Sequence, residues 1–345
     1  MHIIEASDVN SAWAQGREFL LEYGQREKSR AGDVLVAPSP VTTVYLNPRR
    51  RVLFDRVRDA NPFFHLMEAL WMLAGRNDVE FLNRFVKDFG ERFGESDGTM
   101  HGAYGHRWRK AFVIDGVVDD TGDYVPLITD QLQVLISKLE KNPHDRQAVL
   151  EMWNPCSDLT GDWKDRPCNT HAYFRRRDDY LDLTVCCRSN DIYWGAYGAN
   201  AVHFSILLEY MAAMIGCKVG FYYQVSNNFH AYIDVLSRYE FERKLMSRGS
   251  GALHCMSYGP NAETNTYVRD LVADAGMFDR ELELFLANPT EKDVKWNNPF
   301  FNIARYMYIG GTEWRNGGMY DKMRYMPSCD WKDAAEDWLK RRGKW

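Results

Sequence analysis

The sequence predicts an α+β protein in which helices and a large mixed sheet form layers around a hydrophobic core. Of its 345 residues, 45% are hydrophobic and 26% are charged, proportions that are ordinary for globular proteins. No internal repeat, low-complexity tract or Gly/Ser/Pro-rich linker divides the chain. The predicted strands and helices do not alternate regularly, which disfavours a doubly wound nucleotide-binding sheet. We therefore expect one domain over residues 1–345.

The clearest helix is predicted at residues 61–74. Asn61 supplies an N-cap, Pro62 suits the first turn, and Gly75 stands where a C-terminal glycine stop belongs. Apolar residues occupy nearly every face of this segment, which is typical of a buried helix. Further helices are predicted at residues 129–140, 200–215 and 331–345, the last of them basic and amphipathic.

Short β-rich runs predict the strands. Residues 172–174 and 181–186 flank the polar tip 175–179, a pattern typical of an antiparallel hairpin. Such a hairpin brings the end of its second strand beside the start of its first. Further strands are predicted at residues 34–36, 41–46, 147–153 and 219–225.

Charge and composition exclude several classes of protein. A formal net charge of −5 argues against a protein that coats nucleic acid or an anionic membrane. The N-terminus lacks the basic start of a secretory signal, and the apolar stretch 201–216 is too short to span a bilayer. Seven scattered cysteines without a C-x-x-C pair support neither a zinc site nor a disulfide framework. We expect a cytoplasmic protein without a metal cofactor.

The first candidate for chemistry is a cysteine near two arginines. Cys168 directly precedes the predicted hairpin, and Arg166 would favour its reactive thiolate form. Arg188 and Ser189 follow the second strand, and an arginine with a hydroxyl is typical of a phosphate site. A buried inert thiol and a surface Arg–Asp pair are the alternative interpretations. The hairpin would bring the nucleophile and the phosphate ligands together.

Other polar residues stand at positions that suit a site. Glu68, in the middle of the apolar helix, predicts either a buried Glu–Arg pair or a proton relay. Tyr104 lies between two glycines that allow a ligand to approach, or is simply an aromatic in a glycine-rich turn. Asn200 either caps the helix that it opens or pairs with the edge of a base. His230 and Tyr232 would share one strand face and bind a sugar hydroxyl.

Taken together, these motifs resemble the thymidylate synthase superfamily over about residues 25–240. The glutamate-bearing helix, the Tyr-Gly pair, the Pro-Cys pair, the Arg-Ser-Asn-Asp run and the His-x-Tyr pair occur in that family's order. The resemblance implies a thymidylate synthase-like fold whose sheet face forms a homodimer. It also implies 5,10-methylenetetrahydrofolate as co-substrate. Residues 241–345 would be a C-terminal extension or closing region.

The resemblance also implies roles for individual residues. Cys168 would add to C6 of a pyrimidine nucleotide, so that C5 can attack the one-carbon unit. Glu68 and Tyr104 would relay protons, and Asp191 would orient the folate ring. The implied substrate ligands are Arg30, Arg188 and Ser189 for the 5′-phosphate, Arg146 for the same phosphate from the partner subunit, Asn200 for the base, and His230 and Tyr232 for the 3′-hydroxyl.

Departures from the family pattern favour its pyrimidine nucleotide hydroxymethylase branch, which has phage members. In thymidylate synthases a tryptophan shields an exocyclic methylene intermediate from water, whereas an ungapped count places Gly90 at that position. A glycine leaves space for water, which would give a 5-hydroxymethyl product and unoxidised tetrahydrofolate. Asn169 and Cys187 also replace the usual histidine and glutamine. The asparagine amide of Asn200 suits uracil or, rotated by 180°, cytosine; we favour dCMP, then dUMP, over CMP.

Three alternatives remain at this point. The first is reductive methylation by a thymidylate or 5-methyl-dCMP synthase, which would release dihydrofolate. The second is a cysteine hydrolase that uses Cys168 with His171 or His230. The third is a catalytically inactive nucleotide-binding or assembly protein.

Overall fold

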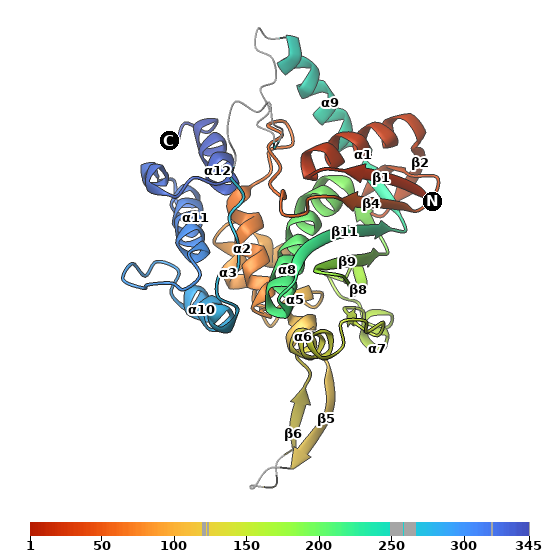
Figure 1. Ribbon diagram of the computed structural model, residues 1–345. Coiled ribbons are helices and arrows are strands. Elements are labelled where there is room, and N and C mark those ends of the chain that lie inside the picture. The colour runs from red at the N-terminus through yellow and green to blue at the C-terminus, as the bar shows by residue number, and fades with distance from the viewer. Residues whose placement is uncertain (119–121, 123, 249–257, 259–266, 319, 345) are drawn as a thin grey trace.

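The computed structural model describes residues 1–118, 122, 124–248, 258, 267–318 and 320–344. Its body is a six-stranded mixed sheet in the order β1-β4-β11-β9-β8-β7, with helices layered against it (Figure 1). The α+β prediction is therefore confirmed. The strands of this sheet are β1 (His2–Ala6), β4 (Val41–Tyr45), β7 (Val149–Glu151), β8 (Asn169–Arg177), β9 (Tyr180–Cys187) and β11 (Lys218–Ser226).

Two smaller sheets complete the strand pairing of the described residues. A four-stranded sheet has the order β10-β12-β3-β2, and a separate β5–β6 hairpin projects from the body (Figure 1). Strands β10 and β12 pair in parallel, so Asp191 lies opposite His230. These strands are β2 (Gln25–Ser29), β3 (Gly32–Val36), β5 (Val113–Val118), β6 (Tyr124–Ile128), β10 (Asn190–Asp191) and β12 (Phe229–Tyr232).

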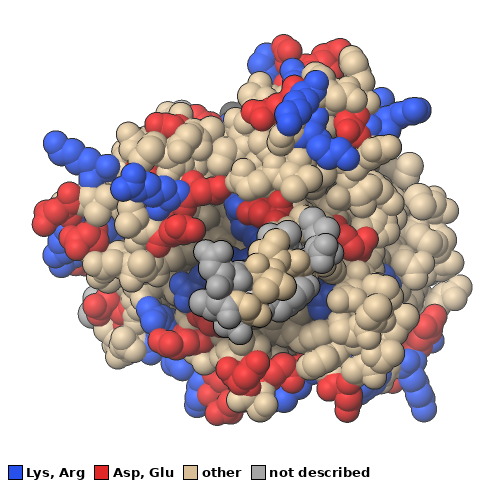
Figure 2. Space-filling model, turned by 90° about the horizontal axis from the view of Figure 1, so that it is seen from below, with Lys and Arg blue, Asp and Glu red and all other residues tan. Residues whose placement is uncertain are grey.

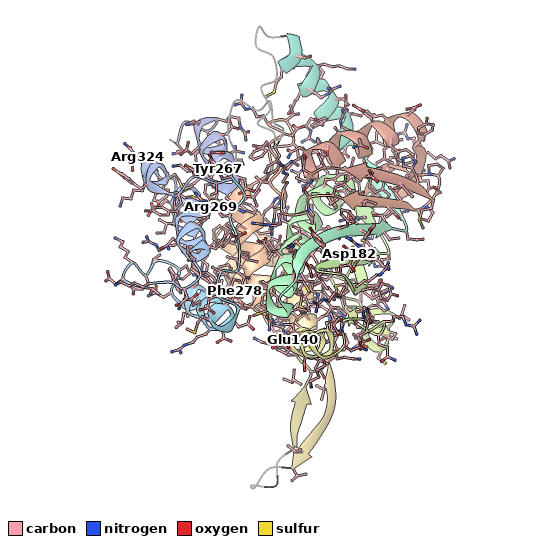
Figure 3. The ribbon with its side chains drawn as sticks, viewed as in Figure 1. Glu140, Asp182, Tyr267, Arg269, Phe278 and Arg324 are labelled. Carbon is pink, nitrogen blue, oxygen red and sulfur yellow. The ribbon has the colours of Figure 1, made fainter. Side chains whose placement is uncertain are left out.

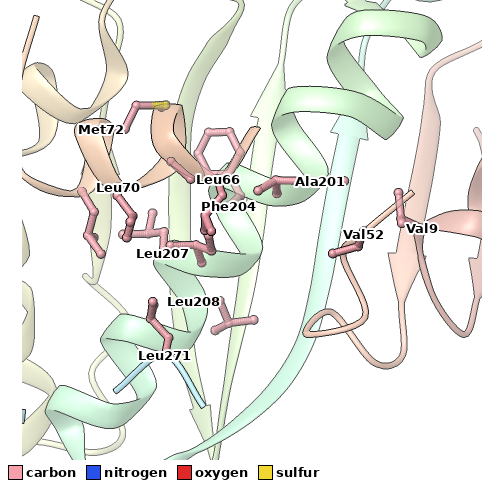
Figure 4. Packing of buried hydrophobic residues seen from close by; sticks show 14 of the residues in the cluster. Val9, Val52, Leu66, Leu70, Met72, Ala201, Phe204, Leu207, Leu208 and Leu271 are labelled. Carbon is pink, nitrogen blue, oxygen red and sulfur yellow. The ribbon is translucent and has the colours of Figure 1, made fainter. Parts of the chain in front are cut away.

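Helix α8 (Asn200–Ile215) lies at the centre of the molecule, between the sheet and α2 (Pro62–Leu73). Leu66 and Leu70 of α2 are buried beside Phe204 and Leu207 of α8 (Figure 4). The other helices are α1 (Val9–Tyr23), α3 (Val79–Asn83), α4 (Phe89–Phe93), α5 (Tyr104–Arg109), α6 (Gln131–Lys141), α7 (Pro155–Asp158), α9 (Ile233–Arg248), α10 (Ala275–Ala287), α11 (Phe300–Arg315), α12 (Asp330–Lys340), the π-helix η1 (Ile192–Ala199) and the 3-10 helix η2 (Asp321–Tyr325).

The capping residues explain which predicted helix ends are correct. The Asn61 side chain accepts a hydrogen bond from Phe64 N, and Pro62 is the first helical residue, as predicted. The helix predicted at 129–140 starts at Gln131, because the Asp130 side chain is its cap. The helix predicted at 331–345 ends at Lys340. Of the strand predicted at 147–153, three residues belong to β7.

One interpretation of Asn200 is wrong. Helix α8 begins at Asn200 and ends at Gly216 as predicted, and the φ of 73° at Gly216 suits a glycine stop. Its cap position, however, is Ala199, because α8 continues the π-helix η1 after a kink at Gly198, so Asn200 does not act as a helix cap. Residues 192–215 therefore form a stretch with the length and composition of a membrane span. In the apolar 18-residue window of this stretch, 83% of the residues are buried inside the protein, as in a core helix.

The C-terminal helices pack against the core as a further layer. Trp338 of α12 contacts Phe63 of α2, with ring centroids 5.7 Å apart. Phe278 of α10 lies beside α8 (Figure 3), and its ring is 5.6 Å from that of Tyr210. On the face seen in Figure 2, basic and acidic side chains are interspersed, which fits the small net charge.

Candidate active site

The β8–β9 hairpin brings Cys168 and Arg188 together. Asn169 at the start of β8 pairs with Cys187 at the end of β9. One residue further out, Arg188 N donates a hydrogen bond of 2.8 Å to Cys168 O. The Arg188 guanidinium donates to Pro167 O at 2.9 Å, which fixes it beside the thiol. The predicted adjacency of these strand ends is thus present in the structure.

Arg188, and not Arg166, is the cation that acts on the Cys168 thiol. Burial raises the pKa of this thiol, and the positive charge of Arg188 opposes that rise. Arg166 instead donates to the backbone oxygen of Gly161. The expectation that Arg166 favours the thiolate is therefore corrected. The net shift is upward, so the thiol is neutral at neutral pH in the free protein.

Tyr104 holds the backbone at Cys168. Its hydroxyl oxygen accepts hydrogen bonds from Cys168 N at 3.0 Å and Asn169 N at 3.1 Å. Burial raises the pKa of Tyr104 far above its usual value, so its hydroxyl stays protonated. Tyr104 is the first residue of α5 and does not lie in a glycine-rich turn. The following Gly105 packs so tightly on α2 that an added Cβ would lie 1.8 Å from Met72 O.

Glu68 pairs with a histidine and not with an arginine. Its Oε2 lies 2.9 Å from Nε2 of His203, which comes from the central helix α8. Burial of its ring, together with Arg58 and His203, lowers the pKa of the nearby His65 to about 3. A neutral imidazole is therefore present next to a carboxylate–imidazole pair. A carboxylate and an imidazole at this distance are groups that could pass a proton between them.

Four of the predicted substrate ligands line one cavity. It has a volume of about 260 Å³, and Arg30 and Ser189 contribute to its wall. His230 and Tyr232 lie two residues apart on β12 and face the same cavity, as their strand spacing predicted. The chain connects this cavity to Cys168, because Ser189 of the cavity wall directly follows Arg188, whose N–H donates to Cys168 O.

Asn200 belongs to a buried chain of side-chain amides. Its Oδ1 accepts from Asn169 Nδ2, and its Nδ2 donates to Asn190 Oδ1, both at 3.0 Å. Asn190 Nδ2 in turn donates to Gln224 Oε1 at 3.1 Å and Ser226 Oγ at 2.8 Å. Each of these side chains is at most 5% exposed. These hydrogen bonds fix the position of the Asn200 amide, and it could turn by 180° only if Asn169 and Asn190 turned with it.

Asp191 begins the π-helix η1 through a side-chain cap. Its Oδ2 accepts hydrogen bonds from Tyr193 N at 3.0 Å and Trp194 N at 2.7 Å. Its Oδ1 is buried and has no hydrogen-bond partner among the described residues. Burial raises the pKa of this carboxyl. A polar ligand atom would satisfy the free oxygen.

Two of the predicted site residues lie away from Cys168 and from the cavity lined by Arg30 and His230. Arg146 is exposed on the turn before β7 and lines a different hollow, together with Asn142 and Asp145. Gly90 lies in α4, and a Cβ there would meet Val79 Cγ2 of α3 at 2.9 Å. The space beside Gly90 is thus filled by α3, which differs from the open space that we expected.

The sequence interpretation missed several residues of the site. His203 lies on the helix predicted at 200–215, one turn after Asn200, which was a signal for its inward position. Asn190 stood inside the Arg-Ser-Asn-Asp motif, although we assigned it no role. Asp165, three residues before Cys168, adds a buried negative charge near the thiol.

The chain belongs to the thymidylate synthase family. A family model described as Thymidylate synthase matches residues 55–268. The chain is accordingly a one-carbon transferase, and this family uses methylenetetrahydrofolate as co-substrate.

Individual relatives point to one branch of this family. The chain is 40% identical over 361 aligned residues to a deoxyuridylate hydroxymethyltransferase of Pseudomonas phage M6, covering 99% of this chain and 95% of the relative. A second protein of that name, from Bacillus phage SP01, is 40% identical over 56% of this chain and 50% of its own length. A thymidylate synthase of Symbiobacterium thermophilum is 31% identical over 51% of this chain and 62% of its own length.

Proposed function

We propose that this enzyme converts dUMP into 5-hydroxymethyl-dUMP, with methylenetetrahydrofolate as one-carbon donor and water as the source of the hydroxyl. The observation that carries the proposal is the position of Cys168. It lies beside Arg188, and the next residue, Ser189, lines the cavity to which Arg30 and His230 also contribute. The name of the phage M6 relative, similar over nearly the whole chain, supports the hydroxymethyl product.

The same relatives change our preference for the base from dCMP to dUMP. The Asn200 amide offers one donor and one acceptor, which suits either base according to its orientation. Both phage relatives are named for deoxyuridylate. We therefore propose that Asn200 binds the uracil edge, with Asn169 and Asn190 holding its amide in place.

For the remaining residues we propose the roles that the family resemblance implies. Cys168 adds to C6, and Arg188 and Ser189 bind the 5′-phosphate. The Glu68–His203 pair relays protons to the pyrimidine ring, and the free oxygen of Asp191 orients the folate ring. The hydroxyl of Tyr104 fixes the backbone of the nucleophile, so that its sulfur keeps one direction.

A homodimer is part of the proposal. One row across the six-stranded sheet consists of Val149, Tyr173, Thr184 and Tyr223, which are paired in register and therefore share a face. Val149 is 40% and Tyr173 is 43% exposed, whereas their neighbours Leu150 and Ala172 are fully buried on the other face. A second copy would cover this row, and Arg146 would then reach the partner's phosphate site.

The test is to incubate the protein with methylenetetrahydrofolate and either dUMP, dCMP or CMP, and to identify products by mass. We expect 5-hydroxymethyl-dUMP and no dihydrofolate. Cys168→Ala should abolish the product, whereas Cys156→Ala, at an exposed cysteine, should not change it. A 5-methyl product with an equal amount of dihydrofolate would instead establish reductive methylation. The hydrolase and the inactive binding protein both predict no pyrimidine product.

A further inference from the structure

The chain of side-chain amides around Asn200 continues to Gln224 on strand β11 and ends at a backbone carbonyl. Asn200 Nδ2 donates to Asn190 Oδ1 at 3.0 Å, and Asn190 Nδ2 donates to Gln224 Oε1 at 3.1 Å. Gln224 Nε2 then donates to Ala196 O, in the π-helix η1, at 3.3 Å. Gln224 is fully buried. The amide of Asn200 is thus connected to a fixed group of the backbone.

This backbone carbonyl gives the whole chain of amides a direction. A carbonyl oxygen can only accept a hydrogen bond, so the Nε2 group of Gln224 must face Ala196 O. Gln224 Oε1 then faces Asn190, whose Nδ2 donates to it. Asn190 Oδ1 consequently faces Asn200 Nδ2. The hydroxyl of Tyr222, 2.9 Å from Gln224 Nε2, can donate or accept and therefore sets no direction.

The other end of the chain of amides has no such fixed group. Asn169 Nδ2 donates to Asn200 Oδ1 at 3.0 Å. Asn169 Oδ1 is buried and has no hydrogen-bond partner among the described residues. Asn169 therefore follows the direction of Asn200 and does not set it. After these contacts, the Asn200 amide keeps one donor position and one acceptor position for a ligand.

Uracil and cytosine carry opposite hydrogen-bonding patterns at two neighbouring ring positions. Uracil donates from N3–H and accepts at O4, whereas cytosine accepts at N3 and donates from its N4 amino group. An amide with one fixed direction pairs with one of these patterns. Against the other pattern it places donor against donor and acceptor against acceptor, which leaves buried polar groups unpaired. The direction of the Asn200 amide therefore decides which base is accepted.

We propose that Gln224 is a positioning residue that sets the base preference of the enzyme, because it transmits the direction fixed at Ala196 O to the Asn200 amide. The inference rests on the proposed function, in which Asn200 binds the base and dUMP is the substrate. Gly195 of η1 supports the same arrangement. An added Cβ there would lie 2.8 Å from Asn190 Oδ1, so a glycine allows the close approach of these amides.

Ser226 contacts the same amide as Gln224 but carries no direction. It lies two residues further along β11 and is also fully buried. Asn190 Nδ2 donates to Ser226 Oγ at 2.8 Å. Because a hydroxyl can donate as well as accept, Ser226 satisfies the Asn190 side chain in either direction. Of these two partners, Gln224 is thus the one that distinguishes between the directions.

The experiment compares Gln224→Leu with the matched change Ser226→Ala. Leucine removes the donor and the acceptor of Gln224 and leaves a buried side chain of similar size. For the wild type and both variants, calorimetry measures the Kd of dUMP and of dCMP, and product formation measures kcat/KM for each nucleotide. Urea unfolding reports the stability of each protein. The Kd values test the base preference independently of the chemical product.

We expect Gln224→Leu to lower the preference for dUMP over dCMP on the order of 10-fold or more, as for mispairing of an amide that makes two hydrogen bonds to a base. Ser226 then allows both directions of the Asn190 and Asn200 amides. With both populated, the affinity for dUMP should fall only about 2-fold, while the affinity for dCMP should rise. General damage to the fold would not produce such a gain. Ser226→Ala should keep the wild-type preference.

An unchanged preference in folded Gln224→Leu would overturn the inference, and so would an equal change in Ser226→Ala or a wild type that binds both nucleotides equally. If Gln224→Leu does not fold, Asn190→Leu breaks the same chain one link nearer to Asn200 and must give the same loss of preference. A wild type that prefers dCMP would refute the proposed substrate. Loss of that preference in Gln224→Leu alone would still support the role of Gln224.

Discussion

Replacing Gly105 by alanine should damage both stability and catalysis, because this glycine lets α5 lie directly on α2. An added Cβ would lie 1.8 Å from Met72 O, whereas ordinary contacts begin at 3.4 Å. The two helices must therefore separate by roughly 1.6 Å, which is overpacking of a kind that costs about 1–3 kcal/mol or more. Tyr104 is the adjacent residue and would move with α5, away from Cys168 N and Asn169 N.

Displacement of Tyr104 should lower catalysis even in molecules that fold. A shift of a catalytic group by about 1 Å can lower the rate on the order of 100-fold. Urea unfolding measures the loss of stability, and product formation with dUMP measures the loss of rate. Gly276→Ala is the matched control, because that helical glycine has its nearest contact at 3.5 Å and a permitted backbone. A Gly105→Ala protein with wild-type stability and rate would refute the reasoning.

Three further changes test other parts of the structure. Tyr104→Phe should cost about 2–4 kcal/mol in urea unfolding, because two backbone N–H groups lose their acceptor, and should lower the rate of product formation. Asp158→Ala should cost about 3–5 kcal/mol by the same measurement, since it leaves the buried Arg107 without its carboxylate. In the wild type the raised pKa of Asp165 means that stability is lost as pH rises from about 4 to above 6, so Asp165→Asn should be more stable at pH 8 by up to about 3 kcal/mol in the free energy of unfolding.

Local signals in the sequence were enough for several elements of the fold. The cap at Asn61 and the glycine stop at Gly216 are determined by their own few residues, and both ends are found as predicted. The π-helical segment 192–199 was not predictable in the same way. Its geometry depends on contacts with α1 and β12, which lie far from it in sequence. The strand order β1-β4-β11 is equally non-local.

In the site, too, the sequence predicts which chain segments meet but not how every side chain is oriented. Motif spacing placed Cys168 and Arg188 at adjacent strand ends, because an antiparallel hairpin has a fixed geometry. Spacing could not show which way a side chain points. Arg166 is nearer than Arg188 to the cysteine in sequence, yet it turns to Gly161. Gly90 occupies the counted position, yet its missing Cβ would face Val79.

The electrostatics of Cys168 connect substrate binding with its reactivity. In the free protein, burial keeps the thiol neutral despite the nearby charge of Arg188, and the negative charge of Asp165 adds to this effect. A neutral thiol is a poor nucleophile and is also less readily oxidised. In the proposed mechanism, Cys168 therefore adds to C6 only when the nucleotide is bound, so that a sulfur–carbon bond forms as the thiol loses its proton and no buried thiolate persists. In such a site the Cys168 sulfur is rarely a free thiolate. The hydrogen bonds of the Cys168 backbone with Tyr104 and Arg188 hold the residue in one position before the substrate binds.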